Sequence, residues 1–212
     1  MSVIREKRDA SNFHEVCLRC YGDMILDQGD LESLVIETEE LMLPRLSSEV
    51  VDGRLIIDLK SWRDHLQSQK YPVRLEITLK EIRSISVPGS ATLLADGIRS
   101  EKLHLMISGS VNGVLNRLKA ESLKITIPGS CRLEIAGEVN ALEAHITGSA
   151  KLKGEQLACQ TAEVRISGTA EADLRVEKSL TIGISGSGTL RYRGKPQISQ
   201  RISGLGEVIA LD

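Results

Sequence analysis

The sequence predicts an all-β protein built as a parallel β-helix (β-solenoid), and three observations lead to this fold class. A glycine recurs every 18 to 20 residues through the second half of the chain. Apolar and polar residues alternate on both sides of each of these glycines. Aromatic residues make up only 2% of the 212 residues, although hydrophobic content is 41%. A stack of thin, similar layers buries aliphatic side chains that recur from layer to layer, and it needs few large rings.

The recurring glycine marks seven predicted rungs. Two residues before each glycine stands a β-branched aliphatic residue, and four before stands an aliphatic residue, with Gln200 as the exception. Two residues after it stand only small residues or valine. This alternation is typical of strands with one buried face, and the glycine indicates a corner or bulge where a side chain would not fit. The predicted rung corners are Gly89, Gly109, Gly129, Gly148, Gly168, Gly186 and Gly204.

A rung of 18 to 20 residues has room for two or three short strands that pair with the rungs above and below at a spacing of roughly 4.8 Å. The six-residue beat of left-handed hexapeptide helices is absent, so we expect the right-handed form, although the residues themselves do not encode handedness. An antiparallel sandwich with regular hairpins is the alternative fold. The constant spacing and the similar turns favour the solenoid.

We expect one continuous domain. Residues 1–12 read as a polar N-terminal tail, and residues 13–80 as an N-terminal β cap with irregular first rungs. Within the cap, residues 60–72 predict a helix or loop excursion, and Asp52-Gly53 predicts a hairpin turn. Residues 81–212 form the repetitive solenoid, whose first end the cap must shield from water.

Several short motifs resemble a known bacterial family. A Gln28-Gly29 turn, the hairpin Asp52-Gly53-Arg54-Leu55 and rungs of the type Ser185-Gly186-Ser187-Gly188 follow one another in this order. From about residue 13 to its end, the chain resembles the family described as "putative auto-transporter adhesin, head GIN domain", whose function is unknown. The resemblance implies a β-helix that binds a partner at the cell surface. The chain departs from the family in two ways. Family members are mostly exported, whereas no leader is visible in this sequence, and five of the seven copies replace the second glycine, by Ala91, Val111, Cys131, Ala150 and Ala170.

Charge and hydropathy exclude several classes of protein. The chain has 27 basic and 29 acidic residues without a basic stripe, which argues against nucleic acid as a partner. No run of 18 apolar residues exists, so no membrane span is expected. The first 15 residues lack the apolar region of a signal peptide, which predicts a cytoplasmic protein as written, or a cell-envelope or extracellular one if a leader was removed.

The cysteines offer the one motif shaped like a metal or redox site, Cys17-x-x-Cys20. A zinc site needs a second pair, which the sequence lacks, and residues three apart on a strand point to opposite faces. Cys131 occupies a small inward position and is expected in the core. Cys159 lies between glycine corners and is expected to be inert, with a reactive thiol as the other possibility. We therefore expect no metal and no cofactor.

Polysaccharide lyases and hydrolases include β-helices, so paired carboxylates are the test for an enzyme. Catalytic acids of glycosidases converge within about 5–10 Å. Glu171 and Glu207 share the same outward position but lie in rungs that are not adjacent, with Thr189 between them. The four histidines, His14, His65, His104 and His145, are scattered, and the glycines are spread one per rung and form no phosphate-binding loop. We predict no catalytic residues.

A row of small hydroxyl side chains follows the glycines directly. It could form a regular surface for a glycan or another ordered ligand, or its hydroxyls could satisfy backbone groups at tight corners. We favour the second interpretation. The row consists of Ser90, Ser110, Ser130, Ser149, Thr169 and Ser187, and Leu205 takes its place in the last rung.

Two functions fit these patterns, and a carbohydrate-active enzyme is the outlier. The first is a non-enzymatic binding or adhesion module that recognises a surface glycan or protein. The second is a cytoplasmic structural protein that self-associates end to end, as bactofilin-type β-helices do. No capping helix is evident after the last rung, so Val208, Ala210 and Leu211 are the candidate end interface of a homo-oligomer.

Overall fold

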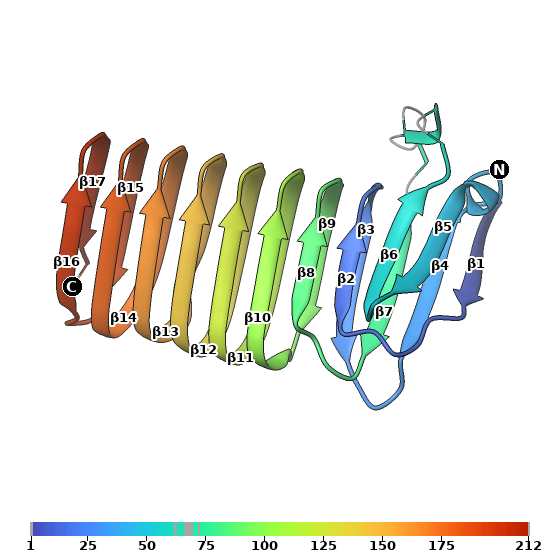
Figure 1. Cartoon of the computed structure of the whole chain (residues 1–212), viewed down its shortest axis with the longest axis horizontal. Coiled ribbons are helices and arrows are strands. Elements are labelled where there is room, and N and C mark those ends of the chain that lie inside the picture. Colours follow the sequence, from blue (N-terminus) through green and yellow to red (C-terminus); the bar gives the residue numbers. More distant parts are fainter. Residues whose placement is uncertain (1, 62, 66–69, 72, 212) are drawn as a thin grey trace.

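The computed structural model describes residues 2–61, 63–65, 70–71 and 73–211, and it confirms the predicted β-solenoid (Figure 1). The seventeen strands of this part of the chain form one continuous hydrogen-bonded sheet. The strands are β1 (Val3–Arg8), β2 (Glu15–Leu18), β3 (Tyr21–Gln28), β4 (Ser33–Glu39), β5 (Leu46–Val51), β6 (Arg54–Leu59), β7 (Arg74–Leu79), β8 (Ser84–Val87), β9 (Ser90–Asp96), β10 (Arg99–Ile107), β11 (Ser110–Ile127), β12 (Ser130–Ile146), β13 (Ser149–Ile166), β14 (Thr169–Ile184), β15 (Ser187–Arg193), β16 (Gln197–Ile202) and β17 (Leu205–Ala210), with a 3-10 helix η1 (Leu43–Arg45).

The rungs stack in parallel and in register. Val111 pairs with Cys131, and Cys131 with Ala150, so residues at one position of the repeat lie directly over one another. The long strands β11 to β14 each run from one glycine corner, around a second bend, to the next corner. Bulges mark the second bend, for instance between Leu115 and Leu118. The antiparallel sandwich is therefore excluded for the repeats.

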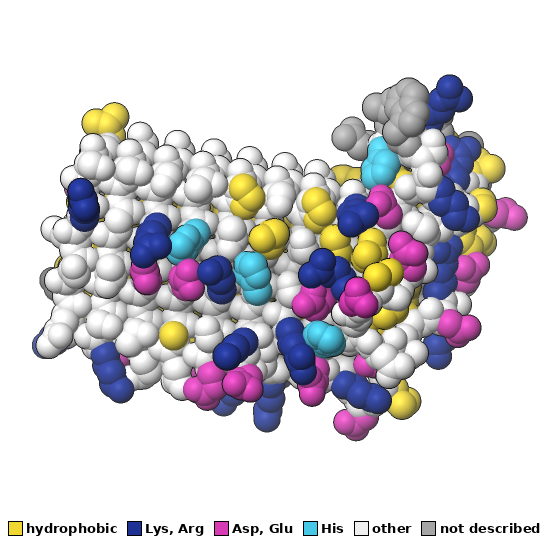
Figure 2. Space-filling model, in the orientation of Figure 1, with side chains coloured by type: hydrophobic (Ala, Val, Ile, Leu, Met, Phe, Trp, Pro, Cys, Tyr) yellow, Lys and Arg dark blue, Asp and Glu magenta, His cyan; other side chains and the backbone are white. Residues whose placement is uncertain are grey.

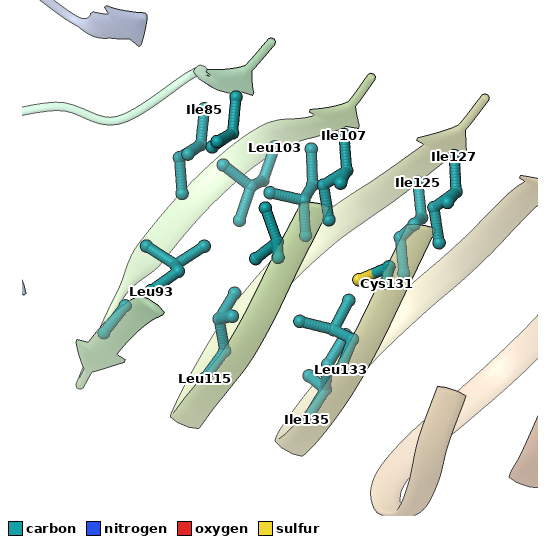
Figure 3. Close-up of a cluster of buried hydrophobic side chains, with 14 of the residues drawn as sticks. Ile85, Leu93, Leu103, Ile107, Leu115, Ile125, Ile127, Cys131, Leu133 and Ile135 are labelled. Atoms are coloured by element: carbon teal, nitrogen blue, oxygen red, sulfur yellow. The ribbon is translucent and has the colours of Figure 1, made fainter. Parts of the chain in front are cut away.

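The core is a set of aliphatic ladders (Figure 3). Ile107, Ile127 and Ile146 stack two residues before their glycines, and each is fully buried. Leu93 and Leu133 stand on the strands that follow the corners and are also fully buried. Each ladder gains one residue from every rung, because every rung repeats the same alternation of apolar and polar residues. Aliphatic side chains therefore fill the core, and few aromatic residues are needed to build it.

The glycine corners are in direct backbone contact. A Cβ on Gly129 would lie 2.2 Å from the carbonyl oxygen of Gly109, and at the other six corners it would lie 1.7–2.3 Å from a backbone oxygen of the rung before. After six of these glycines, the next amide N–H donates to the corner glycine carbonyl of the rung before, as Ser130 does to Gly109 at 2.9 Å. No side chain fits between corners packed this closely.

The first rung is formed by residues that glycine-based alignment misses. Strands β2 and β3 pair in parallel with β8 and β9 on one side and with β6 and β7 on the other (Figure 1). In this rung Cys20 stands at the corner and Tyr21 aligns with Ser90. The strands on the other side of this rung, β6 and β7, are separated by residues 60–73, which contain no glycine, so no glycine corner of that segment stacks on Cys20.

Antiparallel strands close the first end of the stack. β4 pairs with β7, and β1 pairs with β4, so residues 1–12 contain a sheet strand where a polar tail was expected. The Asp52-Gly53 hairpin between β5 and β6 is confirmed, with positive φ angles of 50° and 76° that suit a two-residue turn. Of the predicted 60–72 excursion, residues 63–65 are helical, and residues 62, 66–69 and 72 lie outside the described part.

Replacing one corner glycine should destabilise the whole stack. We expect Gly129→Ala to lower the free energy of unfolding by about 3 kcal/mol, because the added methyl group must push two rungs apart. Gly183→Ala is the matched control, since its Cβ would meet only the Arg165 Cγ at 3.8 Å. Chemical denaturation of both variants measures the difference. Equal stability of the two would contradict the close-contact explanation.

Candidate binding groove

A shallow groove of about 1130 Å³ runs along the strands that follow the glycine corners. Three parallel rows of residues line it, at one, two and three positions after each corner. The first row is the Ser/Thr row, which comprises Ser90, Ser110, Ser130, Ser149, Thr169 and Ser187. The groove therefore follows the axis of the solenoid, and each rung contributes one residue to each row.

The hydroxyls of the Ser/Thr row are free to bind a ligand. Within the described residues, none of the six makes a hydrogen bond to another protein group. The backbone at these positions is already paired, because the amides of Ser149, Thr169 and Ser187 each donate to a glycine carbonyl of the preceding rung at 2.9 Å. The interpretation that these hydroxyls satisfy backbone groups at the corners is therefore wrong, because backbone stacking does this instead.

The floor of the groove is low because the second row is made of short side chains. Ala91, Cys131 and Ala170 are buried there, and Gly188 and Gly206 continue the row toward the end of the solenoid. The replacements of the second glycine that distinguish this chain from the "GSG" pattern, three by alanine and one each by valine and cysteine, thus form the floor. Any larger residue at these positions would project into the core or raise the floor.

The third row is polar and nearly balanced in charge. Its members are Thr92, Asn112, Arg132, Lys151, Glu171, Thr189 and Glu207. Lys151 and Glu171 form an ion pair at 2.9 Å, and the hydrogen bond from Lys151 holds the pKa of the Glu171 carboxyl below its ordinary value. Arg132 is exposed and has no ion-pair partner among the described side chains.

Large side chains stand at both ends of the Ser/Thr row. Tyr21 lies at the first rung and is 43% exposed, and Leu205 lies at the last rung and is 84% exposed. Sequence reasoning missed Tyr21, because the search was anchored on glycine and Cys20 replaces it. The signal was present, since Val16, Leu18 and Met24 repeat the inward aliphatic positions of the later rungs.

The face formed by the strands before the corners differs from the groove, because its charged residues pair with one another (Figure 2). Lys124 bonds Glu143 at 2.9 Å, and His145 contacts the same carboxylate at 2.9 Å. His104 contacts Thr126 at 3.1 Å, and burial is the main cause that lowers its pKa. No three His, Cys, Asp or Glu side chains of the described residues lie where they could share a metal ion.

The four cysteines are free and buried, including Cys17 and Cys20. Burial raises the pKa of Cys20, Cys131 and Cys159 to about 12. The thiol of Cys159 donates to the Leu157 carbonyl at 3.6 Å. We therefore expect the thiols of Cys20, Cys131 and Cys159 to be protonated and unreactive at neutral pH.

The candidate end residues differ in exposure. Val208 and Leu211 are half-buried and Ala210 is exposed. The larger apolar exposure of the last rung lies elsewhere, at Leu205 (84%) on β17 and at Ile198 (43%) and Ile202 (38%) on β16. In β16 all six residues are exposed, because the inward side of this strand has no further rung over it in the described part of the chain.

Comparison with known proteins gives the family. The family described as "Putative auto-transporter adhesin, head GIN domain" matches residues 12–196. The chain belongs to this family. No curated protein matches the sequence.

Solved structures share the whole architecture. A putative adhesin from Bacteroides fragilis superposes with a TM-score of 0.91 at 18% identity, over 99% of this chain and 97% of that one. A putative adhesin from Parabacteroides distasonis reaches 0.72 at 22% identity, with 99% and 97% covered. A protein from the same species called a putative lipid binding protein reaches 0.69 at 19%, with 99% and 97% covered. At these identities the likeness shows the fold. None of these names is that of an enzyme.

In the described part of this adhesin-family chain, no helix is long and apolar enough to cross a membrane.

Because three thiols are buried, we expect them to react slowly with thiol reagents and the folded protein to lose stability at alkaline pH. We expect Cys20, Cys131 and Cys159 to resist a disulfide reagent such as dithionitrobenzoate at pH 8 and to react once the chain is unfolded. Their pKa is raised in the folded state from 9.0 to about 12, so stability is intact below pH 9 and falls as pH rises from 9 toward 12. Rapid labelling of these three thiols in the native protein would contradict their assignment to the core.

Proposed function

We propose that this chain is a non-enzymatic, adhesin-type binding module that holds an extended partner along the groove at the cell surface. The observation that carries the proposal is the unpartnered Ser/Thr row, open over its full length. A hydroxyl can donate one hydrogen bond and accept two, so six free hydroxyls in line present a dense, ordered binding surface. The names of the family and of its structural neighbours support the adhesin class and the surface location.

The opposite face is a weaker candidate because several of its charged side chains already pair with one another. Arg54 pairs with Glu15 at 2.6 Å, and Arg165 pairs with Glu163. A ligand there would have to break these contacts, and exposed ion pairs contribute little affinity of their own. At the Ser/Thr row, by contrast, a ligand gains hydrogen bonds without displacing any protein partner.

A catalytic role receives little support from the same residues. Glu171 is paired with Lys151, and its lowered pKa favours the ionised carboxylate. A general acid would need the protonated carboxyl instead. Glu207 lies two rungs further along the groove, with Thr189 between them. A module that binds and does not turn over its ligand is the simpler function for this arrangement.

Blocking the groove should abolish binding while leaving the fold intact. We expect Ser130→Arg to lose the partner that the native chain selects from a panel of immobilised polysaccharides and extracellular-matrix proteins, because the long side chain fills the centre of the Ser/Thr row. Thr181→Arg is the control, since Thr181 is exposed on the opposite side of the corner. Surface plasmon resonance measures both, and unchanged thermal unfolding verifies that both fold. Equal binding by the two variants would remove the groove from the function.

A second candidate function is self-association through the last rung. Ile198, Ile202 and Leu205 are exposed there, and edge strands present unpaired backbone groups that favour pairing with another chain. At the other end, the outer edge strand β1 carries Arg5, Glu6, Lys7 and Arg8, which disfavours a head-to-tail contact. We therefore propose a tail-to-tail dimer as a closed alternative to an end-to-end filament.

Light scattering over a concentration series tests the dimer. We expect the mass to rise to twice that of the monomer and then stop, because a two-fold contact uses up the open end. Ile202→Lys should keep the chain monomeric, and Thr181→Lys should not. A monomer at every concentration removes this candidate, and growth beyond two copies would favour the filament.

A further inference from the structure

We propose that the ligand of the groove is a neutral, linear polysaccharide that lies extended along the solenoid axis, with one sugar unit per rung. This inference rests on the proposed function and specifies the chemical class of its partner. Three properties of the groove select this class: the repeat distance of its hydroxyls, the balance of its charges, and the side chains at its ends.

The repeat distance favours a sugar chain over a peptide. Parallel strands are spaced about 4.8 Å apart, so successive hydroxyls of the Ser/Thr row recur at this interval. This is close to the length of one pyranose unit in a straight chain. An extended peptide advances about 3.3 Å per residue, so its residues fall out of step with rungs that are about 4.8 Å apart.

The balance of charge disfavours polyanions. The groove holds two cations, Arg132 and Lys151, and two carboxylates, Glu171 and Glu207. Lys151 is already neutralised by Glu171 at 2.9 Å, which leaves Arg132 as the one cation without a partner among the described lining residues. A polyanion needs several phosphate or sulfate contacts along its length, and this groove does not offer them.

The lining groups match the polar edges of sugars. The Ser/Thr row borders one side of the floor, and Thr92, Asn112 and Thr189 border the other. No hydrogen bond ties the side chains of these three residues to protein groups in the described part of the chain. A sugar unit over the low floor can therefore bond to both rows of the same rung, and the pattern repeats in the next rung.

The ends of the row set the length and the direction of the ligand. From Tyr21 to Leu205 the row spans eight rungs, which is about 34 Å at about 4.8 Å per rung. The exposed ring of Tyr21 offers a flat apolar face against which a sugar ring can pack at the capped end. Leu205 offers no such face, so the two ends of the polysaccharide are bound differently.

Oligosaccharides of defined length test the inference with the full chain. The probes are β-1,4-linked gluco-, manno- and xylo-oligosaccharides of two, four and six units, with malto-oligosaccharides as curved chains and heparin as a polyanion. Calorimetry should show affinity for at least one straight series that rises at least about tenfold from two to six units, since each added unit meets another rung. Ser130→Arg should weaken the six-unit ligand at least about tenfold, Tyr21→Ala about fivefold, and Thr181→Arg not at all.

The outcomes separate this inference from the proposed function. Binding of heparin or of a matrix protein that Ser130→Arg abolishes would overturn the neutral polysaccharide and leave the groove as a binding site. Affinity that does not change with length would overturn the arrangement of one unit per rung, and so would equal binding of curved and straight chains. If no straight series binds, the inference fails, whereas the proposed function fails only if Ser130→Arg retains whatever partner the native chain selects.

Discussion

The close contact between successive glycine corners is the constraint on which the rest of this solenoid depends. At Gly109 a Cβ would lie 1.7 Å from the carbonyl oxygen of Gly89, a distance that no side chain tolerates. Because the corners pack this closely, the following amide can bond the carbonyl of the rung before, as Ser110 does at 3.1 Å. The strands on both sides are thereby held in one register, and the aliphatic ladders of the core follow from that register.

The groove is a consequence of the same contact. The backbone of each corner satisfies itself, so the next side chain has no structural task and points outward with its hydroxyl free. The short residue that follows keeps the floor low. A repeat whose corners stack therefore also carries a straight row of hydroxyl groups whose spacing is that of β-strands. Tyr21, Arg132 and Leu205 on the same surface are exposed and lie outside the core.

The two ends of the stack differ in how their outermost rungs are covered. The first rung, β2 and β3, is covered by strands that come later in the chain, and antiparallel pairing of β4 and β1 completes the cover. Gln28 takes part in this closure, since its side-chain amide accepts from the Arg99 amide at 2.7 Å and donates to the Lys80 carbonyl at 2.9 Å. At the last rung, by contrast, the apolar side chains of Ile198 and Ile202 on β16 are exposed in the described part of the chain.

The sequence by itself determined the repeat, its glycine corners, the aliphatic ladders, the Asp52-Gly53 hairpin and the family, because these depend on neighbours within one rung or on a strict period. It could not determine that residues 15–28 lie between β6–β7 and β8–β9, nor that residues 1–12 add a strand. Those placements depend on pairing between segments distant in the chain. In the first rung the corner glycine is replaced by Cys20, so the glycine repeat does not extend to this rung. Only the tertiary structure decided that the serine hydroxyls are unpartnered, because a hydroxyl finds or lacks a partner through the stacking of whole rungs, which no single repeat encodes.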